Sequence, residues 1–248
     1  PRGVPVVSDY DDAVFHRYDQ HRSKIVQAVL GRKIDRVMAR STLVMAGNPY
    51  LAERAHKAGA ARIEIVPTVV DADAYCATPR RVLDARPRIG WIGMPSTWSE
   101  YMAPMQKMLV DLAQRNGAGL RVVGAGVESQ GSIESLPWTE ESEGRSIQGM
   151  DIGLMPLDDS PWSRGKCGYK LIQYMACSLP VVASPVGVNI DIIEDGVTGF
   201  LANGEQEWRT AITRLLANPE LRRRMGEAGR QRMEERYSLQ TWGPKVAN

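Results

Sequence analysis

The chain has 248 residues, of which 43% are hydrophobic and 24% charged, as is ordinary for a globular protein with one large or two modest domains. A net charge of +2 gives no case for binding nucleic acid, and no apolar run reaches the ~18 residues of a transmembrane segment. The three cysteines, Cys76, Cys167 and Cys177, fit neither a disulfide framework nor a zinc site, which indicates a reducing compartment.

The first part of the chain predicts a small α/β unit. Short apolar runs predict strands, at residues 4–8, 41–46 and 63–67. The segment 13–40 has helical character, although two patterns overlap in it. Asn48 before Pro49 predicts the start of a helix, and Gly59 predicts its end, because asparagine caps helix N-termini and glycine ends helices.

An acidic group follows the first predicted strand. Asp9, Asp11 and Asp12 are interpreted as part of a turn with a helix cap. The alternative is a metal site, since paired carboxylates hold Mg²⁺ or Mn²⁺ next to a diphosphate.

Residues 68–87 are polar and rich in proline and arginine, which predicts a hinge. Beyond it the sequence predicts strands at 88–93, 120–124, 133–136, 151–155, 180–184 and 199–201. Helices are predicted at 99–115, 139–148, 169–178, 205–217 and 218–237. Strands with few charges between helices predict a parallel sheet that is covered on both faces. Arg222 and its arginine neighbours are interpreted as a solvated helix face.

The loop that follows the strand at 151–155 carries the strongest sign of a ligand, because ligands bind at the carboxyl ends of parallel strands. It contains Arg164 and Lys166 next to Gly165 and Gly168, and Lys170 lies in the first turn of the next helix. A helix N-terminus favours anions, so cations there indicate a bound anion such as a phosphate. The alternative is a solvated basic loop.

Other loops give weaker signs. Gly93, Ser96 and Thr97 follow the strand at 88–93 and offer N–H and hydroxyl donors to the same anion, with a tight turn as the alternative. Gln173, on one helix face with Lys170 and Tyr174, is predicted to bind a ribose diol, or to be a surface glutamine. Cys167 has a lowered pKa if it faces the helix start, or else packs the loop.

Five runs of the sequence resemble the C-terminal domain of retaining GT-B glycosyltransferases of the group 1, family 4 type. They are RIGWIG (88–93), DIGLMPL (151–157), PWSRGKCGYK (161–170), YMACSLPVVASPVGVN (174–189) and EDGVTGFL (194–201). The resemblance implies two Rossmann-like α/β domains around a cleft, the second of which binds a nucleoside diphosphate sugar. Residues 1–67 would be the remnant of the first, acceptor-side domain, 68–87 the hinge, 88–237 the donor-binding domain and 238–248 a tail.

The resemblance also implies roles for single residues. Contacts with the donor diphosphate are expected from Gly93, Ser96, Thr97, Arg164, Lys166, Gly168, Tyr169 and Lys170. Gln173 is expected at the ribose, and Leu136, Pro137 and Trp138 near the base. Gly165, Val188 and Asn189 are expected near the donor sugar. Enzymes of this type use basic side chains and helix N–H groups in place of a metal, so no metal and no cofactor are expected.

Two positions depart from the commonest family pattern. Many members carry two glutamates eight residues apart, where this chain has Gly165 and Gln173. The sequence therefore predicts donor binding without naming the sugar. The acceptor is left open among a sugar, a lipid-linked sugar and a glycan.

The resemblance places the protein in polysaccharide or glycoconjugate biosynthesis. We expect it in the cytoplasm, free or peripheral to the inner face of the membrane, and paired with its missing N-terminal half or with itself. It is expected to be an enzyme that is inactive as this fragment if the missing half is needed. The alternatives are a non-catalytic nucleotide-sugar-binding or assembly module, and a metal-dependent transferase that uses Asp9, Asp11 and Asp12.

Overall fold

The computed structural model describes residues 3–75 and 86–247, so that the middle of the predicted hinge, with Cys76, lies outside the described residues. Contacts divide the chain into two units. Unit 1 comprises Pro1–Thr68, Asp159–Gly168 and Val186–Val188, and unit 2 comprises Val69–Asp158, Tyr169–Pro185 and Asn189–Asn248. The predicted boundaries placed the loops 159–168 and 186–188 in the second domain, whereas their contacts place them in unit 1.

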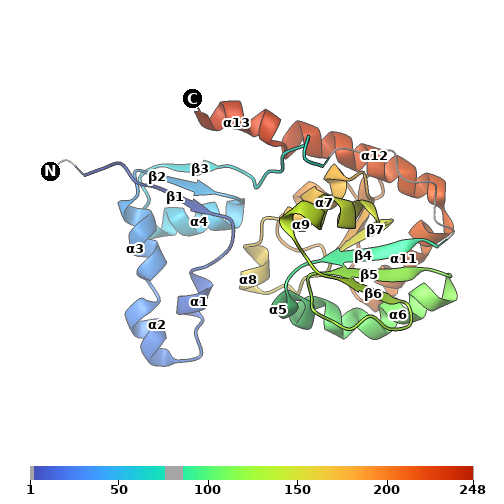
Figure 1. Ribbon diagram of the computed structural model, residues 1–248. Helices are drawn as coiled ribbons and strands as arrows, with labels where there is room; N and C mark the ends of the chain where they lie inside the picture. The colour runs from blue at the N-terminus through green and yellow to red at the C-terminus, as the bar shows by residue number, and fades with distance from the viewer. Residues whose placement is uncertain (1–2, 76–85, 248) are drawn as a thin grey trace. The chain divides into compact units, whose positions relative to one another are not determined.

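Unit 1 is built on a parallel sheet of three strands, in the order β1-β2-β3 (Figure 1). The strands are β1 (Val7–Tyr10), β2 (Leu43–Ala46) and β3 (Ile63–Ile65). The helices are α1 (His16–Asp19), α2 (Lys24–Leu30), α3 (Lys33–Arg40), α4 (Pro49–Ala58) and α8 (Pro161–Arg164). Buried side chains from β1, β2 and α4, such as Tyr10, Val44 and Leu51, form its core together with Phe15 and Met38.

The capping prediction for α4 is confirmed, because the Asn48 side chain accepts a hydrogen bond from the Leu51 amide at 2.9 Å and Gly59 has a left-handed φ of 88°. The helical character of the segment 13–40 is confirmed, since it forms the three short helices α1, α2 and α3. One prediction is wrong. Asp9 lies within β1, not in a turn, because that strand begins and ends later than predicted.

Unit 2 contains, within the described residues, a parallel sheet of six strands in the order β6-β5-β4-β7-β8-β9. The strands are β4 (Arg88–Ile92), β5 (Gly119–Val123), β6 (Ile133–Leu136), β7 (Ile152–Met155), β8 (Val181–Ala183) and β9 (Gly199–Leu201). The predicted parallel sheet is thereby confirmed. β4 pairs with both β5 and β7, and the strand order reverses between β4 and β7, which is where doubly wound sheets bind ligands.

The helical segments of unit 2 are α5 (Pro95–Thr97), the π-helical η1 (Trp98–Met102), the 3₁₀-helical η2 (Ala103–Met105), α6 (Gln106–Arg115), α7 (Glu140–Gln148), α9 (Tyr169–Ala176), α10 (Asn189–Ile192), α11 (Glu205–Ala217), α12 (Pro219–Arg236) and α13 (Leu239–Ala247). The predicted helix at 99–115 is therefore wrong in its start and its regularity. Its irregular turns contain Pro104, which has no N–H for a helical hydrogen bond. Most of the segment predicted as a C-terminal tail forms α13.

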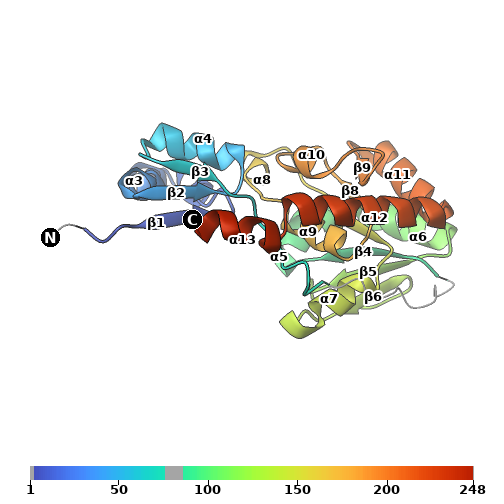
Figure 2. The ribbon, with the colours of Figure 1, turned by 90° about the horizontal axis from the view of Figure 1, so that it is seen from above.

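Helices cover both faces of the unit 2 sheet (Figure 2). Ile152 and Leu154 of β7 join the core that α6 and α11 complete. Gly153, between them, is packed against the ring of Tyr174 on α9. Because successive side chains of a strand point to opposite faces, α6 and α9 cover opposite faces. No helix of the described residues is long and apolar enough to cross a membrane.

The helix predicted at 205–217 is confirmed as α11, and its Trp208 and Ile212 are buried. The prediction for Arg222 on α12 is wrong. Its side chain is buried, and it donates hydrogen bonds to the carbonyl oxygens of Leu215 and Leu216 at the C-terminus of α11. This arginine therefore satisfies helix carbonyls that would otherwise lack a donor.

Candidate functional site

The carboxyl end of β4 is closed by a glycine that has no room for a side chain. A Cβ atom built on Gly93 would lie 2.6 Å from Cη2 of Trp91 and 3.0 Å from Cε of Lys170. The Lys170 ammonium also lies over the Trp91 ring, 5.8 Å from its centroid. Gly93 is therefore required where the backbone, the indole and the lysine stem meet. This brings together two predicted site residues from distant parts of the sequence.

The next strand end contacts this point directly. Gly124 has a φ of 82°, and a Cβ atom on it would lie 2.7 Å from the carbonyl oxygen of Gly93 and 3.1 Å from Cβ of Trp138. Leu136 ends β6 and accepts a hydrogen bond from the Gly124 amide at 2.9 Å. The close approach holds the ends of β4, β5 and β6 together. It also places Trp138, which is 51% exposed, at this edge of the sheet.

A hydrogen-bond network extends from Trp138 to α9. The Trp138 indole N–H donates to Oε2 of Glu143 on α7 at 2.7 Å. The amide nitrogen of Gln173 donates to Oε1 of the same carboxylate at 2.6 Å, and the Tyr75 hydroxyl also donates to that oxygen. Burial raises the pKa of Tyr75, so its phenol stays protonated and remains a donor. Tyr169 is hydrogen-bonded to Tyr75.

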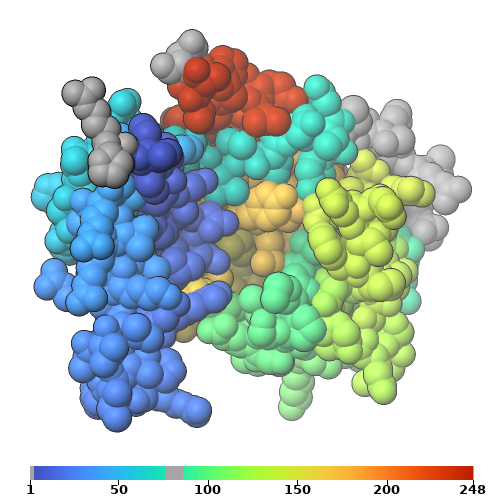
Figure 3. All heavy atoms as spheres, turned by 60° about the vertical axis from the view of Figure 1, so that its left-hand side comes forward, coloured from blue at the N-terminus to red at the C-terminus, as the bar shows by residue number. Residues whose placement is uncertain are grey.

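All of these contacts lie within unit 2. We call these residues the carboxyl-edge ring, which consists of Gly93, Gly124, Trp138, Glu143, Gln173 and Lys170. Gln173 and Lys170 complete it because they lie three residues apart on α9 and so on one helix face. Figure 3 shows α7 and the loop before it (yellow-green) at the surface, beside the segment that follows β4 (green).

Gln173 differs from a surface glutamine, because it is 2% exposed and its amide nitrogen also lies 3.0 Å from the Tyr75 hydroxyl. Its role at a ribose stays a prediction. Tyr174, expected on the same face, is fully buried instead. Its hydroxyl accepts from the Ile92 amide and donates to the Leu154 carbonyl, which fixes α9 on β4 and β7.

The other predicted residues of unit 2 lie near the strand ends. Ser96 and Thr97 belong to the first helical turn after Gly93, and the Thr97 hydroxyl donates to the Met94 carbonyl at 2.9 Å. Pro137 is exposed between Leu136 and Trp138. Asn189 is buried, and its amide nitrogen donates to the Ser184 carbonyl at 3.0 Å, so this group holds the chain after β8. The roles predicted for these residues toward a donor stay predictions.

The basic loop before α9 belongs to unit 1. The exposed Arg164 forms a bidentate ion pair with Asp159, at 2.7 and 2.9 Å. The Lys166 ammonium lies 3.8 Å from Oδ1 of Asp12 and over the Trp162 ring, 5.5 Å from its centroid. Gly168 has a φ of 71° and precedes α9. Diphosphate contacts by Arg164, Lys166 and Gly168 stay predictions.

Gly165, which stands where many family members carry a glutamate, is a packing position. A Cβ atom on it would lie 2.4 Å from Cβ of Ala13. Asn48 donates to the carbonyl oxygens of Gly165 and Lys166, at 3.0 and 3.2 Å. Close packing inside unit 1 thus explains why this loop has a glycine here.

The thiol of Cys167 is buried beside Gly47, and burial raises its pKa to about 12. The lowered pKa that its place near a helix start suggested is therefore wrong, and the packing alternative fits. Val188 belongs to unit 1 as well, next to Gly187, where a Cβ atom would lie 2.8 Å from the Arg164 carbonyl oxygen.

In the described part of the chain, no group of three or more His, Cys, Asp or Glu side chains, and so not Asp9, Asp11 and Asp12, is placed to hold a metal ion. Asp12 faces the Lys166 ammonium, and burial, followed by the charge of Asp11, raises the pKa of Asp9. The metal-dependent alternative on Asp9, Asp11 and Asp12 therefore finds no support in the geometry.

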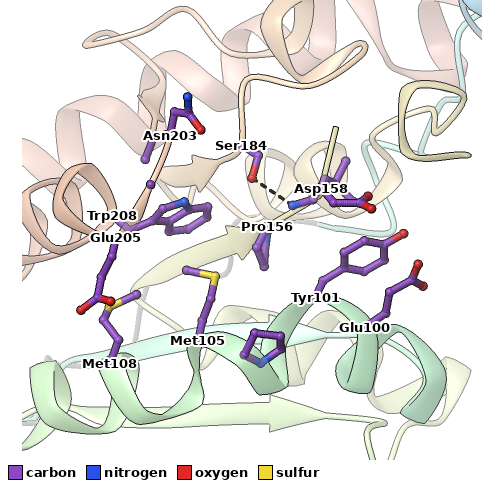
Figure 4. A pocket seen from close by; sticks show the side chains of 14 residues that line it. Glu100, Tyr101, Met105, Met108, Pro156, Asp158, Ser184, Asn203, Glu205 and Trp208 are labelled. Carbon is purple, nitrogen blue, oxygen red and sulfur yellow. Dashed lines mark hydrogen bonds between the residues drawn. The ribbon is translucent and has the colours of Figure 1, made fainter. Parts of the chain in front are cut away.

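Unit 2 also has a cavity of about 400 Å³ near the ends of β7, β8 and β9 (Figure 4). Its inner lining is apolar, with Met105, Met108 and Trp208, whereas Glu100 and Asp158 bring carboxylates to it. The described residues that line this cavity include the carboxylates of Glu100, Asp158 and Glu205 but no lysine or arginine, whereas the carboxyl-edge ring has Lys170 as well as the Glu143 carboxylate, so a diphosphate fits the ring better.

Glu143 and Tyr75 were not predicted as site residues. Glu143 is one of several acidic residues at the start of α7, where the helix dipole alone accounts for them. Tyr75 lies in the segment predicted as a hinge. A usable sign was Trp138, because an indole near a strand end needs an acceptor and Glu143 follows it by five residues.

Comparisons with known proteins bear on the family and the fold of the chain. Residues 151–232 match the family model described as glycosyl transferases group 1. An uncharacterised glycosyltransferase of Methanocaldococcus jannaschii is 39% identical over 66 residues, which are 26% of this chain and 19% of that protein. The alpha-D-kanosaminyltransferase of Streptomyces kanamyceticus is 39% identical over 99 residues, which are 39% of this chain and 25% of that relative. The matched segments are thus a minor part of both relatives.

A solved structure extends the likeness to the whole chain. HepE from Anabaena, in complex with UDP and glucose, superposes with a TM-score of 0.77 and 17% sequence identity, over 98% of this chain and 70% of HepE. At this identity the superposition shows the fold, and the family match adds the kind of domain. The chain therefore contains a domain of the glycosyl transferases group 1 family and has the GT-B type of fold.

Proposed function

We propose that this protein transfers a sugar from a nucleoside diphosphate sugar to an acceptor, with retention and without a bound metal, and that unit 2 binds the donor. The placement of Lys170 carries the proposal. Its stem contacts the Gly93 and Trp91 end of β4, next to the point where the strand order reverses, and it lies in the first turn of α9.

The charge at this point suits a leaving diphosphate. The start of α9 adds backbone N–H groups and the positive end of the helix dipole to the Lys170 ammonium. These groups stabilise the negative charge that develops as the sugar leaves, which is the role a metal has in other transferases. The UDP bound to HepE and the family match support a nucleotide sugar as the donor.

The direct test is calorimetric titration with UDP and GDP, with uridine and guanosine for comparison. Lys170→Ala should weaken diphosphate binding by about 10-fold to 100-fold, because a hydrogen bond to a charged group contributes about 1.5–3 kcal/mol. Affinity for the nucleosides should not change. Lys107→Ala removes an exposed charge on α6 and is the matched control. Equal binding by Lys170→Ala and the wild type would disprove the site assignment.

A separate measurement tests whether the proposed reaction needs a bound metal ion. Nucleotide binding and sugar transfer should be the same with EDTA and with added Mn²⁺. A requirement for Mn²⁺ that Asp11→Asn abolishes would contradict this part and support the metal-dependent alternative.

A non-catalytic nucleotide-sugar-binding module is the second candidate, and Gly165 favours it. This position packs against Ala13 and has no room for the glutamate that many family members carry. The measurement is release of UDP from UDP-glucose with simple sugars and lipid-linked sugars as acceptors. Tight nucleotide binding without release would support the module over the enzyme.

A further inference from the structure

The cavity at the ends of β7, β8 and β9 has an apolar floor and a polar rim (Figure 4). Met105, Met108 and Trp208 line the floor. The exposed Glu100 and Asn203 lie at the rim. The volume of about 400 Å³ falls in the range of ~300–1,000 Å³ that is typical of small-molecule sites. The cavity shares no described lining residue with the carboxyl-edge ring, so it is a second place in unit 2 where a ligand fits.

One polar atom of the floor has no hydrogen-bond partner among the described residues. Trp208 is only 4% exposed, and its indole N–H donates to none of residues 3–75 and 86–247. This N–H is not sealed inside the core, so it is reached from the cavity that the side chain lines. Figure 4 shows the indole pointing from α11 toward Met105. Since a buried indole N–H normally finds an acceptor, the cavity favours a ligand that supplies one.

The charges of the lining exclude two classes of ligand. Among the described residues it has the carboxylates of Glu100, Asp158 and Glu205 and no lysine or arginine, so a phosphate or carboxylate group would be repelled. A wholly apolar ligand would remove water from these carboxylates without replacing its hydrogen bonds. The ligand must therefore donate hydrogen bonds as well as cover the apolar floor.

The surroundings of the carboxylates favour a neutral ligand over an organic cation. Glu205 already forms an ion pair with Arg209, whose Nε lies 2.7 Å from its Oε1. Glu100 is exposed, so water screens its charge. A hydroxyl group suits the whole lining, because it donates to a carboxylate and also accepts from an indole N–H, whereas an ammonium group only donates.

We infer that this cavity binds a pyranose ring of a neutral saccharide that is separate from the sugar of the nucleotide donor. A pyranose carries hydroxyl groups around its edge and C–H groups on its faces, which match the rim and the floor in turn. The inference goes beyond the proposed function. The cavity is built by the segments of η1 to α6 and by α11, whereas Lys170 and Gln173 lie on α9, which covers the other face of the sheet.

The experiment titrates the full chain with the methyl α-glycosides of glucose, mannose, galactose and N-acetylglucosamine, followed by saturation-transfer NMR. At least one of them should bind wild type without a nucleotide. Glu100→Gln should weaken this binding about 5-fold to 10-fold, because an amide oxygen is a weaker acceptor than a carboxylate. Trp208→Phe should weaken it about 3-fold to 10-fold, because it removes the N–H donor. Glu235→Gln, at an exposed glutamate of α12, is the matched control and should bind as wild type does.

The same titration with UDP or UDP-glucose present separates the cavity from the donor site. Both nucleotides should leave the affinity for the glycoside within about twofold. Displacement of the glycoside by either of them would overturn the inference, because the saccharide would then share the donor site. Failure of the proposed function appears differently, as no binding of UDP, and it leaves the glycoside titration as expected.

Other results would overturn the inference as well. They are no binding of any glycoside to wild type, binding that both cavity variants leave unchanged, and tighter binding of glucose 1-phosphate, an anion, than of the glycosides. A preference for glucosamine over methyl glucoside would identify a site for an organic cation instead. Thermal unfolding shows whether Trp208→Phe still folds. If it does not, Glu100→Gln decides the test alone, because it changes an exposed side chain.

Discussion

Adding one methyl group at Gly93 tests the packing on which the candidate site depends. In Gly93→Ala the new Cβ atom would lie 2.6 and 2.7 Å from two atoms of the Trp91 ring and 3.0 Å from Cε of Lys170. Carbon atoms in contact are normally ~3.5–4.0 Å apart. The ring must therefore shift by roughly 1 Å and the lysine stem by roughly 0.5 Å.

The loss of folding stability in Gly93→Ala depends on the side chains that surround these atoms. Trp91 is 2% exposed and packs edge-on against Trp98, with ring centroids 5.5 Å apart, so the indole cannot move into solvent. Overpacking of this kind costs about 1–3 kcal/mol. In a chain of this length, 2 kcal/mol corresponds to a decrease in Tm of about 4–8 °C. Displacement of Lys170 should also weaken nucleotide diphosphate binding, by about tenfold, equivalent to 1.4 kcal/mol.

The matched control is the same substitution at Gly144, in the middle of α7. A Cβ atom there meets only the Ala74 carbonyl oxygen, at 3.9 Å, which is an ordinary contact. Gly144→Ala should raise Tm by about 2–4 °C, because alanine is more favourable than glycine in a helix by about 1 kcal/mol. Thermal unfolding followed by circular dichroism and calorimetric titration with UDP measure both variants. A Gly93→Ala protein with wild-type Tm and wild-type affinity would refute the reasoning.

Two further predictions concern groups buried around α9. Tyr174→Phe should lower the free energy of unfolding by about 1–3 kcal/mol in a urea titration, because it leaves the buried Ile92 amide without its acceptor; an unchanged midpoint would mean that another group accepts from it. Burial raises the pKa of Cys177 to about 12, above the value of 9.0 for a free thiol. The unfolded chain then loses this proton first, so stability is full below pH 9 and falls as pH rises toward 12. Cys177→Ala should show a smaller decrease in Tm between about pH 9 and 10.5 than wild type; parallel curves would contradict the shift.

The sequence was sufficient for the elements whose signals are local. As predicted, Asn48 caps the start of α4 and Gly59 follows its end. The helix α11 also forms where it was predicted, with Trp208 and Ile212 buried. The β-branched runs predicted the strands of unit 2, and their low charge predicted a parallel sheet. The start of the segment after β4 was missed because its π and 3₁₀ turns do not keep a period of 3.6 residues.

The site was only partly accessible to the same reasoning. Glycine exits and a lysine at a helix start led to Gly93 and Lys170, which the structure brings together. The Glu143 network depends on contacts between residues up to 98 positions apart, such as Gln173 and Tyr75, and no local pattern encodes such pairing. The packing of Gly165 on Ala13 is equally non-local.

The division of the loops between the units has a consequence for protein engineering. The chain passes from one unit to the other at residues 68, 158, 168, 185 and 188, so no single cut separates the two. A truncated protein that starts at Val69 would lose Ala13, Gly47 and Asn48. These three residues hold the loop of Gly165 and Cys167 inside unit 1. An isolated unit 2 therefore needs redesigned, shortened links in place of 159–168 and 186–188, or it would carry a thiol and apolar surface that are normally buried.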